Sequence, residues 1–166
     1  MAEMKILEKI AEILHKNCKL TPEQVAAIAE ISVEEAKDAI MELEKTGAIL
    51  GYGAIVNPQK LSFKNKVTAY IELKVTPQRN NGFNRIAKEI YQFPEVKSLN
   101  LMSGSYDFGV TVVGDSIQEI ALFVSEHLAP MDSVISTATH FVLKRFKDDG
   151  IIFETDNEDD REVITL

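Results

Sequence analysis

The chain has 166 residues, of which 45% are hydrophobic, and it carries a formal net charge of −8. This length and apolar content allow one large hydrophobic core or two small ones. An acidic chain lacks the basic surface of a general nucleic-acid coat protein, and no apolar run approaches the about 20 residues of a membrane span. The N-terminus has no secretory signal pattern, and the single cysteine, Cys18, cannot form an internal disulfide. We therefore expect a cytoplasmic protein without a membrane partner.

The charge is distributed unevenly along the chain. Residues 1–60 hold 7 lysines and 10 acidic residues, residues 61–146 hold 9 basic and 8 acidic residues, and residues 147–166 hold 2 basic and 8 acidic residues. The first arginine is Arg79. Most of the excess negative charge belongs to the tail, and the N-terminal segment is itself not basic.

The first 47 residues follow the pattern of three helices. Apolar residues recur at helical spacing over residues 2–16, which predicts the first helix. The sequence TPEQ at residues 21–24 is a capped helix start with proline at the first position, and this short helix stops near Glu30. The sequence SVEE at residues 32–35 repeats the capping pattern and opens a third helix that ends at Gly47. Two short capped helices in close succession predict a helix-turn-helix.

A short strand and a turn are expected after the third helix. Residues 48–56 are small or β-branched and include two glycines, which favours a wing or linker strand. The sequence NPQK at residues 57–60 predicts a turn. We place a domain boundary here, with a helix-turn-helix domain at 1–60, a second domain at 61–150 and an acidic tail at 151–166.

The second domain alternates between strand and helix patterns. Strands are expected at residues 67–75, 96–102, 106–113 and 133–144, with Ser103–Ser105 joining the middle two as a hairpin. Apolar residues at helical spacing predict one helix after the first strand and another after the third. The order β-α-β-β-α-β is the ferredoxin-like split motif. The predicted fold class is therefore α+β, a helix-turn-helix domain followed by a ferredoxin-like domain.

Two helices can cover only one face of a four-stranded sheet, so the other face needs a partner. Literal alternation along the strands places large side chains on that uncovered face: Tyr70, Leu99, Leu101, Phe141 and Leu143. So large an apolar surface is expected to be buried against a second copy of the chain, giving a homodimer.

The tail combines an acidic run with an apolar end. The run from Glu154 to Glu162 predicts a solvated segment. Residues 163–166, with the sequence VITL, could alternatively dock as an edge strand.

Three blocks of sequence, in this order and at this spacing, resemble one protein family. They read LTPEQVAAIAEISVEEAKDAIMELEKTGAILGYGAIVNPQKL, GSYDFGVTV and VISTATHFVLKRFKDDG, within a resemblance that covers about residues 4–150. The chain is similar to the Lrp/AsnC family of feast-or-famine transcription regulators. The resemblance implies a helix-turn-helix that binds double-stranded promoter DNA and a ferredoxin-like domain that senses an amino-acid effector. It also implies homodimers that assemble further, to an octamer.

The third helix departs from the family pattern because it is not basic. If its alanines and leucine face the core, its outward face carries Glu34, Lys37, Asp38, Met41 and Lys45. Two carboxylates beside a phosphate backbone oppose binding, and acids accept from cytosine only where other contacts hold the helix. Our candidates for DNA contact are Lys19, Ser32, Lys37, Met41, Lys45 and Lys60. The alternative is a helix-turn-helix kept as a packing module.

The hairpin loop between the middle strands is the candidate effector site. Glycine lets the backbone approach a ligand, exposed amide N–H groups can take a carboxylate, and Asp107 can accept from an ammonium. These groups can hold a free amino acid at both ends, and the resemblance implies an effector pocket at the corresponding loop. The candidates are Ser103, Gly104, Ser105, Tyr106 and Asp107, with Ser136, Thr137 and Thr139 on the last strand. A tight turn with a capping aspartate is the alternative.

The sequence offers no recognisable catalytic site. His15, His127 and His140 are scattered, and the chain has no HExxH, GxGxxG, GxxxxGK[ST] or GxSxG motif. We expect no catalytic residues, no metal ligands and no cofactor. Two alternatives stay open. One is a metabolite-binding dimer whose helix-turn-helix has weak or no specific DNA binding; the other is an enzyme on the same scaffold, since sirohaem decarboxylases share this architecture.

Overall fold

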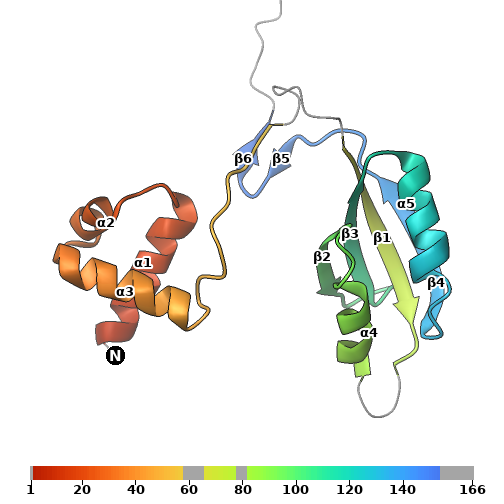
Figure 1. The fold of residues 1–166 in the computed structure, drawn as a ribbon, viewed down its shortest axis with the longest axis horizontal. Coiled ribbons are helices and arrows are strands. Elements are labelled where there is room, and N and C mark those ends of the chain that lie inside the picture. The colour runs from red at the N-terminus through yellow and green to blue at the C-terminus, as the bar shows by residue number, and fades with distance from the viewer. Residues whose placement is uncertain (1, 58–65, 78–81, 154–166) are drawn as a thin grey trace, which may run out of the picture. The chain divides into compact units, whose positions relative to one another are not determined.

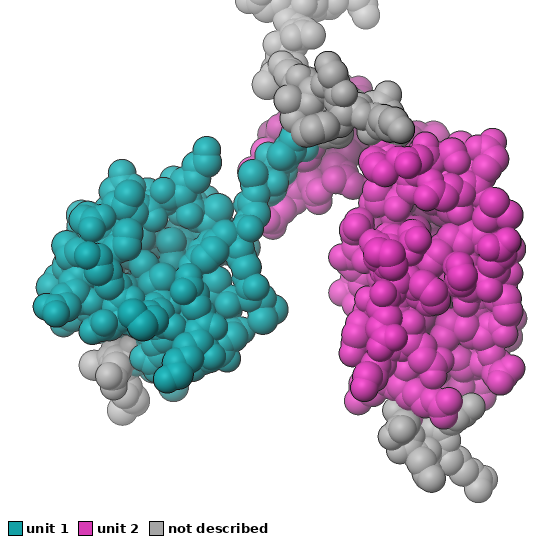
Figure 2. Space-filling model, viewed as in Figure 1, with its two compact units in different colours: residues 1–56 teal, residues 57–166 magenta. Residues whose placement is uncertain are grey.

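The structure, a computed structural model, describes residues 2–57, 66–77 and 82–153 (Figure 1). The chain divides into two compact units, residues 1–56 and 57–166, which Figure 2 shows in different colours. Each unit has its own cluster of buried apolar side chains. Within the described ranges, none of the helices combines the length and the apolar character that crossing a membrane requires.

Unit 1 (residues 1–56) is built from three helices, α1 (Ala2–Lys16), α2 (Pro22–Ala29) and α3 (Val33–Lys45). Glu30 adopts a left-handed conformation, with φ 61°, that ends α2 just before α3 begins. The predicted helix-turn-helix is confirmed. Its core is made of small and branched side chains: Ile10, Leu14, Val25, Ala26, Ala29, Ala36, Ala39 and Leu43.

Local hydrogen bonds fix the starts of α2 and α3, as the capping patterns predicted. Thr21 and Gln24 form a complete capping box at α2. At α3 the Ser32 hydroxyl accepts from the Glu35 N–H at 3.2 Å and donates to the Glu35 carboxylate at 2.7 Å. Hydrogen bonds from the Ser32 hydroxyl and then from the Ser32 N–H hold the pKa of the Glu35 carboxyl below its usual value.

The Glu35 contact predicts an acid-dependent loss of stability in unit 1. Because the folded-state pKa is lowered, the contribution is fully present above the ordinary glutamate pKa of about 4.3 and is lost as the pH falls through the folded value. Unfolding followed by circular dichroism near pH 7 and at about pH 3 should show a smaller pH effect in Glu35→Gln, whose amide oxygen still accepts from Ser32. An unchanged pH effect in Glu35→Gln would assign the acid sensitivity to other carboxylates.

Residues 48–56 do not form the predicted wing strand. Among the described residues this segment has no strand to pair with, and an extended segment without a ladder partner is not a strand. Side chains hold it instead. The Tyr52 hydroxyl donates to the Glu44 carboxylate at 2.8 Å, and the Cys18 thiol lies 3.6 Å from the Gly53 carbonyl oxygen. The composition correctly indicated an extended chain, but it does not show whether a neighbouring strand is present to pair with it.

Unit 2 (residues 57–166) contains a four-stranded antiparallel sheet with the order β2-β3-β1-β4. Its strands are β1 (Val67–Val75), β2 (Val96–Leu101), β3 (Phe108–Gly114) and β4 (Val134–Phe141). Two helices pack on one face of the sheet, α4 (Gly82–Ile90) and α5 (Ile117–Phe123), and α5 continues as a π-helical turn at Val124–Leu128 (Figure 1). This is the ferredoxin-like arrangement, and the predicted α+β class is confirmed.

The core of unit 2 lies between the sheet and these helices. Ile71 and Leu73 of the central strand β1 are fully buried. The Phe108 ring packs edge-on against Phe83 of α4, with ring centroids 5.8 Å apart. Burial of such a side chain is worth about 1.5–3 kcal/mol, and the buried apolar residues of unit 2 form one cluster here.

The prediction that the uncovered face of the sheet is apolar is wrong. Leu99 and Leu101 of β2 pair with buried residues of β3, and Phe141 of β4 pairs with buried Ala69, so all three lie on the helix-covered face. Leu143 follows the end of β4. Tyr70 alone of the predicted set lies on the uncovered face within the sheet.

β-Bulges explain this error. The register shifts between Val96 and Ser98 in β2, and again where Lys74 and Val75 meet β4. Each shift exchanges the two faces along the rest of the edge strand, so literal alternation assigns its side chains to the wrong side. The uncovered face is mostly polar: Tyr70, Glu72, Lys74, Thr111, Ser136 and His140. It gives no hydrophobic reason for a sheet-to-sheet dimer, and dimerisation stays a prediction.

A tyrosine ring lies across a glycine on the uncovered face. Tyr70 covers Gly109 of β3, so that a β-carbon at this position would collide with the ring. The Tyr70 and Tyr106 hydroxyl oxygens lie 2.9 Å apart, with the rings edge to face. This hydrogen bond, assisted by burial, raises the pKa of Tyr70 to about 12. Glycine at position 109 is therefore needed for the tyrosine pair.

Replacing Gly109 with alanine is expected to destabilise unit 2 by about 1–3 kcal/mol, because the Tyr70 ring must move and leave Tyr106. Denaturant unfolding measures this loss. The matched control is the same change in a Tyr70→Ala background, where the ring is absent and the methyl group should cost less than about 1 kcal/mol. An equal cost in both backgrounds would contradict the contact.

A short hairpin follows β4. Its strands are β5 (Lys147–Asp148) and β6 (Ile151–Ile152), joined by Asp149 and Gly150 with φ of 44° and 78°. The predicted tail, residues 151–166, therefore begins with a paired strand. Its acidic run and apolar end lie outside the described residues.

Candidate functional site

One face of α3 is free of core contacts and lies open to solvent. Lys37, Met41 and Lys45 recur every four residues and form a stripe along the helix, which we call the α3 stripe; Met41 is 61% exposed. Glu34 and Asp38 flank it and are exposed as well. Two cations and two carboxylates nearly cancel, so this surface attracts phosphate weakly.

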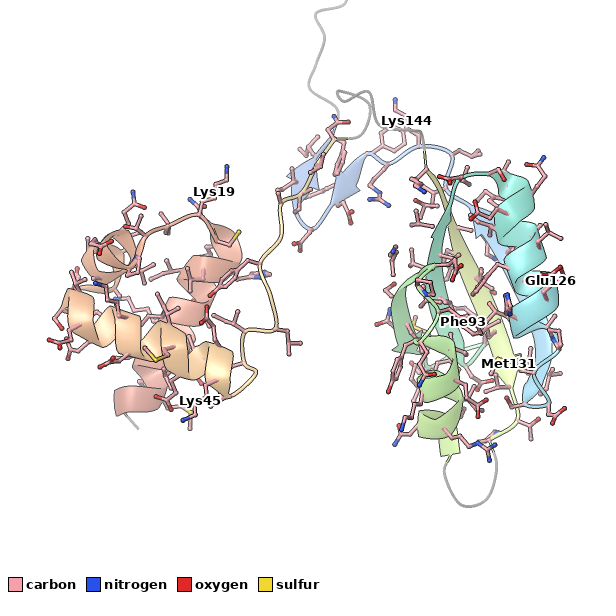
Figure 3. All side chains as sticks on the ribbon, viewed as in Figure 1. Lys19, Lys45, Phe93, Glu126, Met131 and Lys144 are labelled. Carbon is pink, nitrogen blue, oxygen red and sulfur yellow. The ribbon has the colours of Figure 1, made fainter. Side chains whose placement is uncertain are left out.

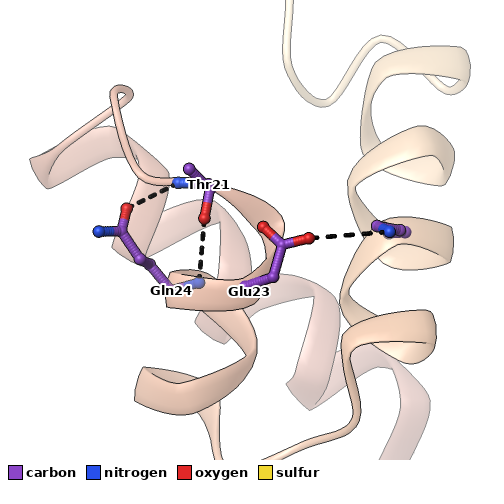
Figure 4. Close-up of polar contacts among 4 residues, drawn as sticks. Thr21, Glu23 and Gln24 are labelled. Atoms are coloured by element: carbon purple, nitrogen blue, oxygen red, sulfur yellow. Dashed lines mark hydrogen bonds and ion pairs between the residues drawn. The ribbon is translucent and has the colours of Figure 1, made fainter.

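An ion pair joins Lys37 to the preceding helix. The Lys37 Nζ lies 3.8 Å from the carboxylate of Glu23, in the first turn of α2 (Figure 4). Both side chains are more than half exposed, so the pair adds little stability. Hydrogen bonds from its own backbone N–H and from Thr21 lower the pKa of Glu23 more than Lys37 does. Lys37 can therefore leave Glu23 for a phosphate at small cost.

The other DNA candidates lie elsewhere. Ser32 is the N-cap of α3, and its hydroxyl is engaged with Glu35. Lys19 lies in the loop after α1 and Lys45 at the end of α3, on opposite sides of unit 1 in Figure 3. Lys60 lies outside the described residues. The structure thus brings Lys37, Met41 and Lys45 together in the α3 stripe, and Lys19 lies apart from them.

The loop between β2 and β3, residues 102–107, is longer than the predicted three-residue turn. A hydrogen bond from the first N–H to the last carbonyl, of 2.8 Å, closes it. Ser103, Gly104 and Ser105 are exposed. Gly104 has φ 151°, a conformation that side chains disfavour. These exposed loop residues lie in the region where a ligand carboxylate was predicted to bind.

Asp107 has structural partners in β1. Its carboxylate Oδ2 accepts from the Val75 N–H at 2.8 Å, and its own N–H donates to the Leu73 carbonyl at 2.9 Å. These bonds attach the loop to the end of β1. A carboxylate can accept further hydrogen bonds, so this capping role and a contact with a ligand ammonium are compatible.

The three hydroxyl residues predicted on the last strand do not share a face. Thr137 and Thr139 pair with buried residues of β1 and lie on the helix-covered side, whereas Ser136 pairs with Lys74 and lies on the uncovered side. Ser136 and Thr137 flank the same end of β1 that holds Asp107. The structure therefore brings Ser136, Thr137 and Asp107 of the predicted effector residues together at this end of β1.

Tyr70 is the neighbour of this loop that sequence reasoning missed. It was expected on an uncovered apolar face, but its hydroxyl bonds to Tyr106 at the base of the loop. The sequence carries little indication of this position, because only the strand register places Tyr70 beside Gly109.

These units define a helix-turn-helix protein with a second, ferredoxin-like domain. Residues 68–152 match the Lrp/AsnC ligand-binding domain. Over 165 residues the chain is 46% identical to YugG of Bacillus subtilis, which is named as an uncharacterized HTH-type transcriptional regulator, covering 98% of this chain and 99% of that protein. The chain belongs to the Lrp/AsnC family of transcriptional regulators, as its sequence blocks predicted.

Solved structures share this fold. A transcriptional regulator from Neisseria meningitidis in complex with L-Met is 22% identical, with a TM-score of 0.68 over 87% of this chain and 92% of that one. The leucine response regulatory protein of Mycobacterium tuberculosis is 19% identical, with a TM-score of 0.71 over 90% and 98%. A more distant sequence relative, 25% identical over 143 residues, is the proline dehydrogenase transcriptional activator of Rhizobium radiobacter, covering 86% of this chain and 90% of that protein.

Proposed function

We propose that this protein is a DNA-binding transcription regulator that responds to an amino acid. The observation that carries the proposal is the exposed α3 stripe on a helix-turn-helix unit, in a chain 46% identical to a transcriptional regulator. Two relatives suggest the class of effector, because one is named as an activator of proline dehydrogenase and another is a complex with L-Met. The relatives are named as regulators, and we propose no enzymatic role.

The two domains divide the work. Residues 1–60 contact DNA, with the α3 stripe entering the major groove and further lysines contacting phosphates. Residues 61–150 bind the effector, with the amides of Ser103–Ser105 on its carboxylate and Asp107 on its ammonium. A cytoplasmic homodimer that assembles to an octamer would present paired helix-turn-helix units to two half-sites.

The weak net charge around the α3 stripe affects the balance between base contacts and phosphate contacts in DNA binding. Glu34 and Asp38 can accept from cytosine N4 in the major groove once lysines hold the helix in place. Carboxylates repel phosphate, so binding without a matching base sequence is expected to be weak. Specificity would then depend on base contacts more than on attraction to the backbone.

DNA binding is the decisive test. The full-length protein is titrated against a labelled fragment from upstream of its own gene, with a scrambled fragment of equal length beside it, at about 50 mM and about 200 mM salt. We expect a preference for the upstream fragment that persists at the higher salt. Equal, salt-labile binding to both fragments, or no binding, would favour the metabolite-binding dimer with a degenerate helix-turn-helix.

The effector class is tested separately by thermal unfolding with each free amino acid in turn. A ligand at 100 times its dissociation constant adds about 2.7 kcal/mol of stability, which a melting curve resolves. Stabilisation by one amino acid or a few related ones is expected. No shift with any of them would remove the amino-acid effector from the proposal while leaving DNA binding untouched.

A further inference from the structure

A groove of about 360 Å³ runs between α4 and β2 in unit 2. Its lining is mixed: the polar residues Asn84, Lys97 and Ser98 line it together with the apolar and aromatic residues Phe83, Ala87, Tyr91, Val96, Leu99, Leu101 and Phe108. Tyr91 is 57% exposed and Leu101 is 58% exposed, so two large side chains that line this groove are open to solvent. None of the predicted effector residues lines this groove. It is therefore a surface separate from the candidate effector site.

The groove lies beside an edge of the sheet. β2 is the outermost strand, and among the described residues it pairs with β3 alone (Figure 1). The outer backbone groups of such an edge strand can pair with an added strand. A groove along the edge then receives alternate side chains of that added strand, which gives the pairing its specificity. The expected occupant is an extended segment with apolar side chains.

The charges around the groove favour an acidic partner. Lys97 lines it, and no carboxylate does. The Lys97 ammonium donates to the Pro94 carbonyl at 2.8 Å, which engages one of its three protons. Lys88 is exposed and lies four residues after Asn84 and three before Tyr91, on the helix face that borders the groove.

The chain carries a segment of matching chemistry. Residues 154–162 contain six acidic residues and one arginine, and residues 163–166 read VITL. Val163, Ile164 and Thr165 are β-branched and therefore favour a strand. In an extended conformation Ile164 and Leu166 point to one side, and Val163 and Thr165 to the other.

The tail has a length similar to the size of unit 2. The nine residues from 154 to 162 span about 30 Å when extended. A unit of about 110 residues has a radius of gyration of roughly 13 Å, so this length is comparable with the diameter of the unit. We propose that residues 163–166 add to the edge strand β2 of their own chain, with Ile164 and Leu166 in the α4–β2 groove and the acidic run beside Lys88 and Lys97.

A peptide-binding experiment tests the pairing directly. A fluorescent peptide with the sequence of residues 158–166 is titrated into the full chain and into a chain shortened to residue 162. We expect saturable binding to the shortened chain. The affinity for the full chain, whose groove is occupied, should be lower by a factor of roughly ten or more. A scrambled peptide is the control. Equal affinity for the two chains, no binding, or equal binding of the scrambled peptide would overturn the proposal.

Hydrogen exchange tests the same contact without a peptide. The amides of β2 that point away from β3 should exchange faster in the shortened chain than in the full chain. In the full chain, Leu166→Asp should have the same effect and Thr165→Asp a smaller one, because only residue 166 points into the groove. Unchanged exchange in the shortened chain would overturn the proposal, and protection that falls on dilution would assign the groove to the tail of a second copy instead.

Discussion

Replacing Asp107 with alanine is expected to remove the effector response and to destabilise unit 2 by about 1–3 kcal/mol. The stability loss arises because the Val75 N–H, which donates to the Asp107 carboxylate at 2.8 Å, loses its partner at a half-buried position. The loss of response arises because the proposed charge-assisted contact with the ligand ammonium disappears. Thermal unfolding with and without the stabilising amino acid measures both effects.

Asp107→Asn separates the two roles. Its amide oxygen can still accept from Val75, so we expect stability within about 1 kcal/mol of the parent protein. The negative charge is gone, so the effector response should still be lost or strongly reduced. A full response in both variants would remove Asp107 from the effector site, and parental stability in Asp107→Ala would show that the Val75 contact is worth little.

Replacing both Lys37 and Lys45 with alanine is expected to weaken binding to every DNA sequence, by roughly a hundredfold at about 50 mM salt. Each lost phosphate contact removes about 0.9 from the slope of log affinity against log salt, which is roughly tenfold in affinity at this salt concentration. Phosphates carry no sequence information, so preference for the upstream fragment should survive. Titrations at four or more salt concentrations give affinity and slope together.

Two further variants make this test specific to α3. Lys5→Ala removes an exposed lysine from α1 and should leave the affinity and the slope unchanged. The pair Glu34→Gln and Asp38→Asn removes two repulsive charges beside the α3 stripe and should tighten non-specific binding at low salt. If Lys5→Ala weakens binding as much as the α3 changes do, or if the neutralised pair does not tighten it, α3 is not the helix that faces DNA.

The helix-turn-helix was readable from the sequence because its signals are local. The hydrogen bonds between Ser32 and Glu35 join residues three apart, and the buried positions of α3 follow its own period. The same reasoning also identified the exposed α3 stripe. It could not identify the ion pair of Lys37 with Glu23, because that contact depends on how α2 packs against α3.

The site in unit 2 was readable only in part for the same reason. The sequence indicated a loop with Gly104 and Asp107 between two strands. Only the folded sheet shows that Asp107 bonds to Val75, 32 residues away, and that Tyr70 reaches Tyr106 across the strands. Contacts of this kind depend on strand register, which the local sequence does not encode.

The sequence by itself determined the caps of α2 and α3, the order of strands and helices, the α+β class and the family, because each rests on residues close together in the chain or on their order. The tertiary structure decided which face of the sheet is polar, which side Leu99 and Phe141 occupy, and that a groove runs beside β2. Those properties depend on two β-bulges and on long-range strand pairing. A shift of one residue in register exchanges the two faces of a strand without changing its composition.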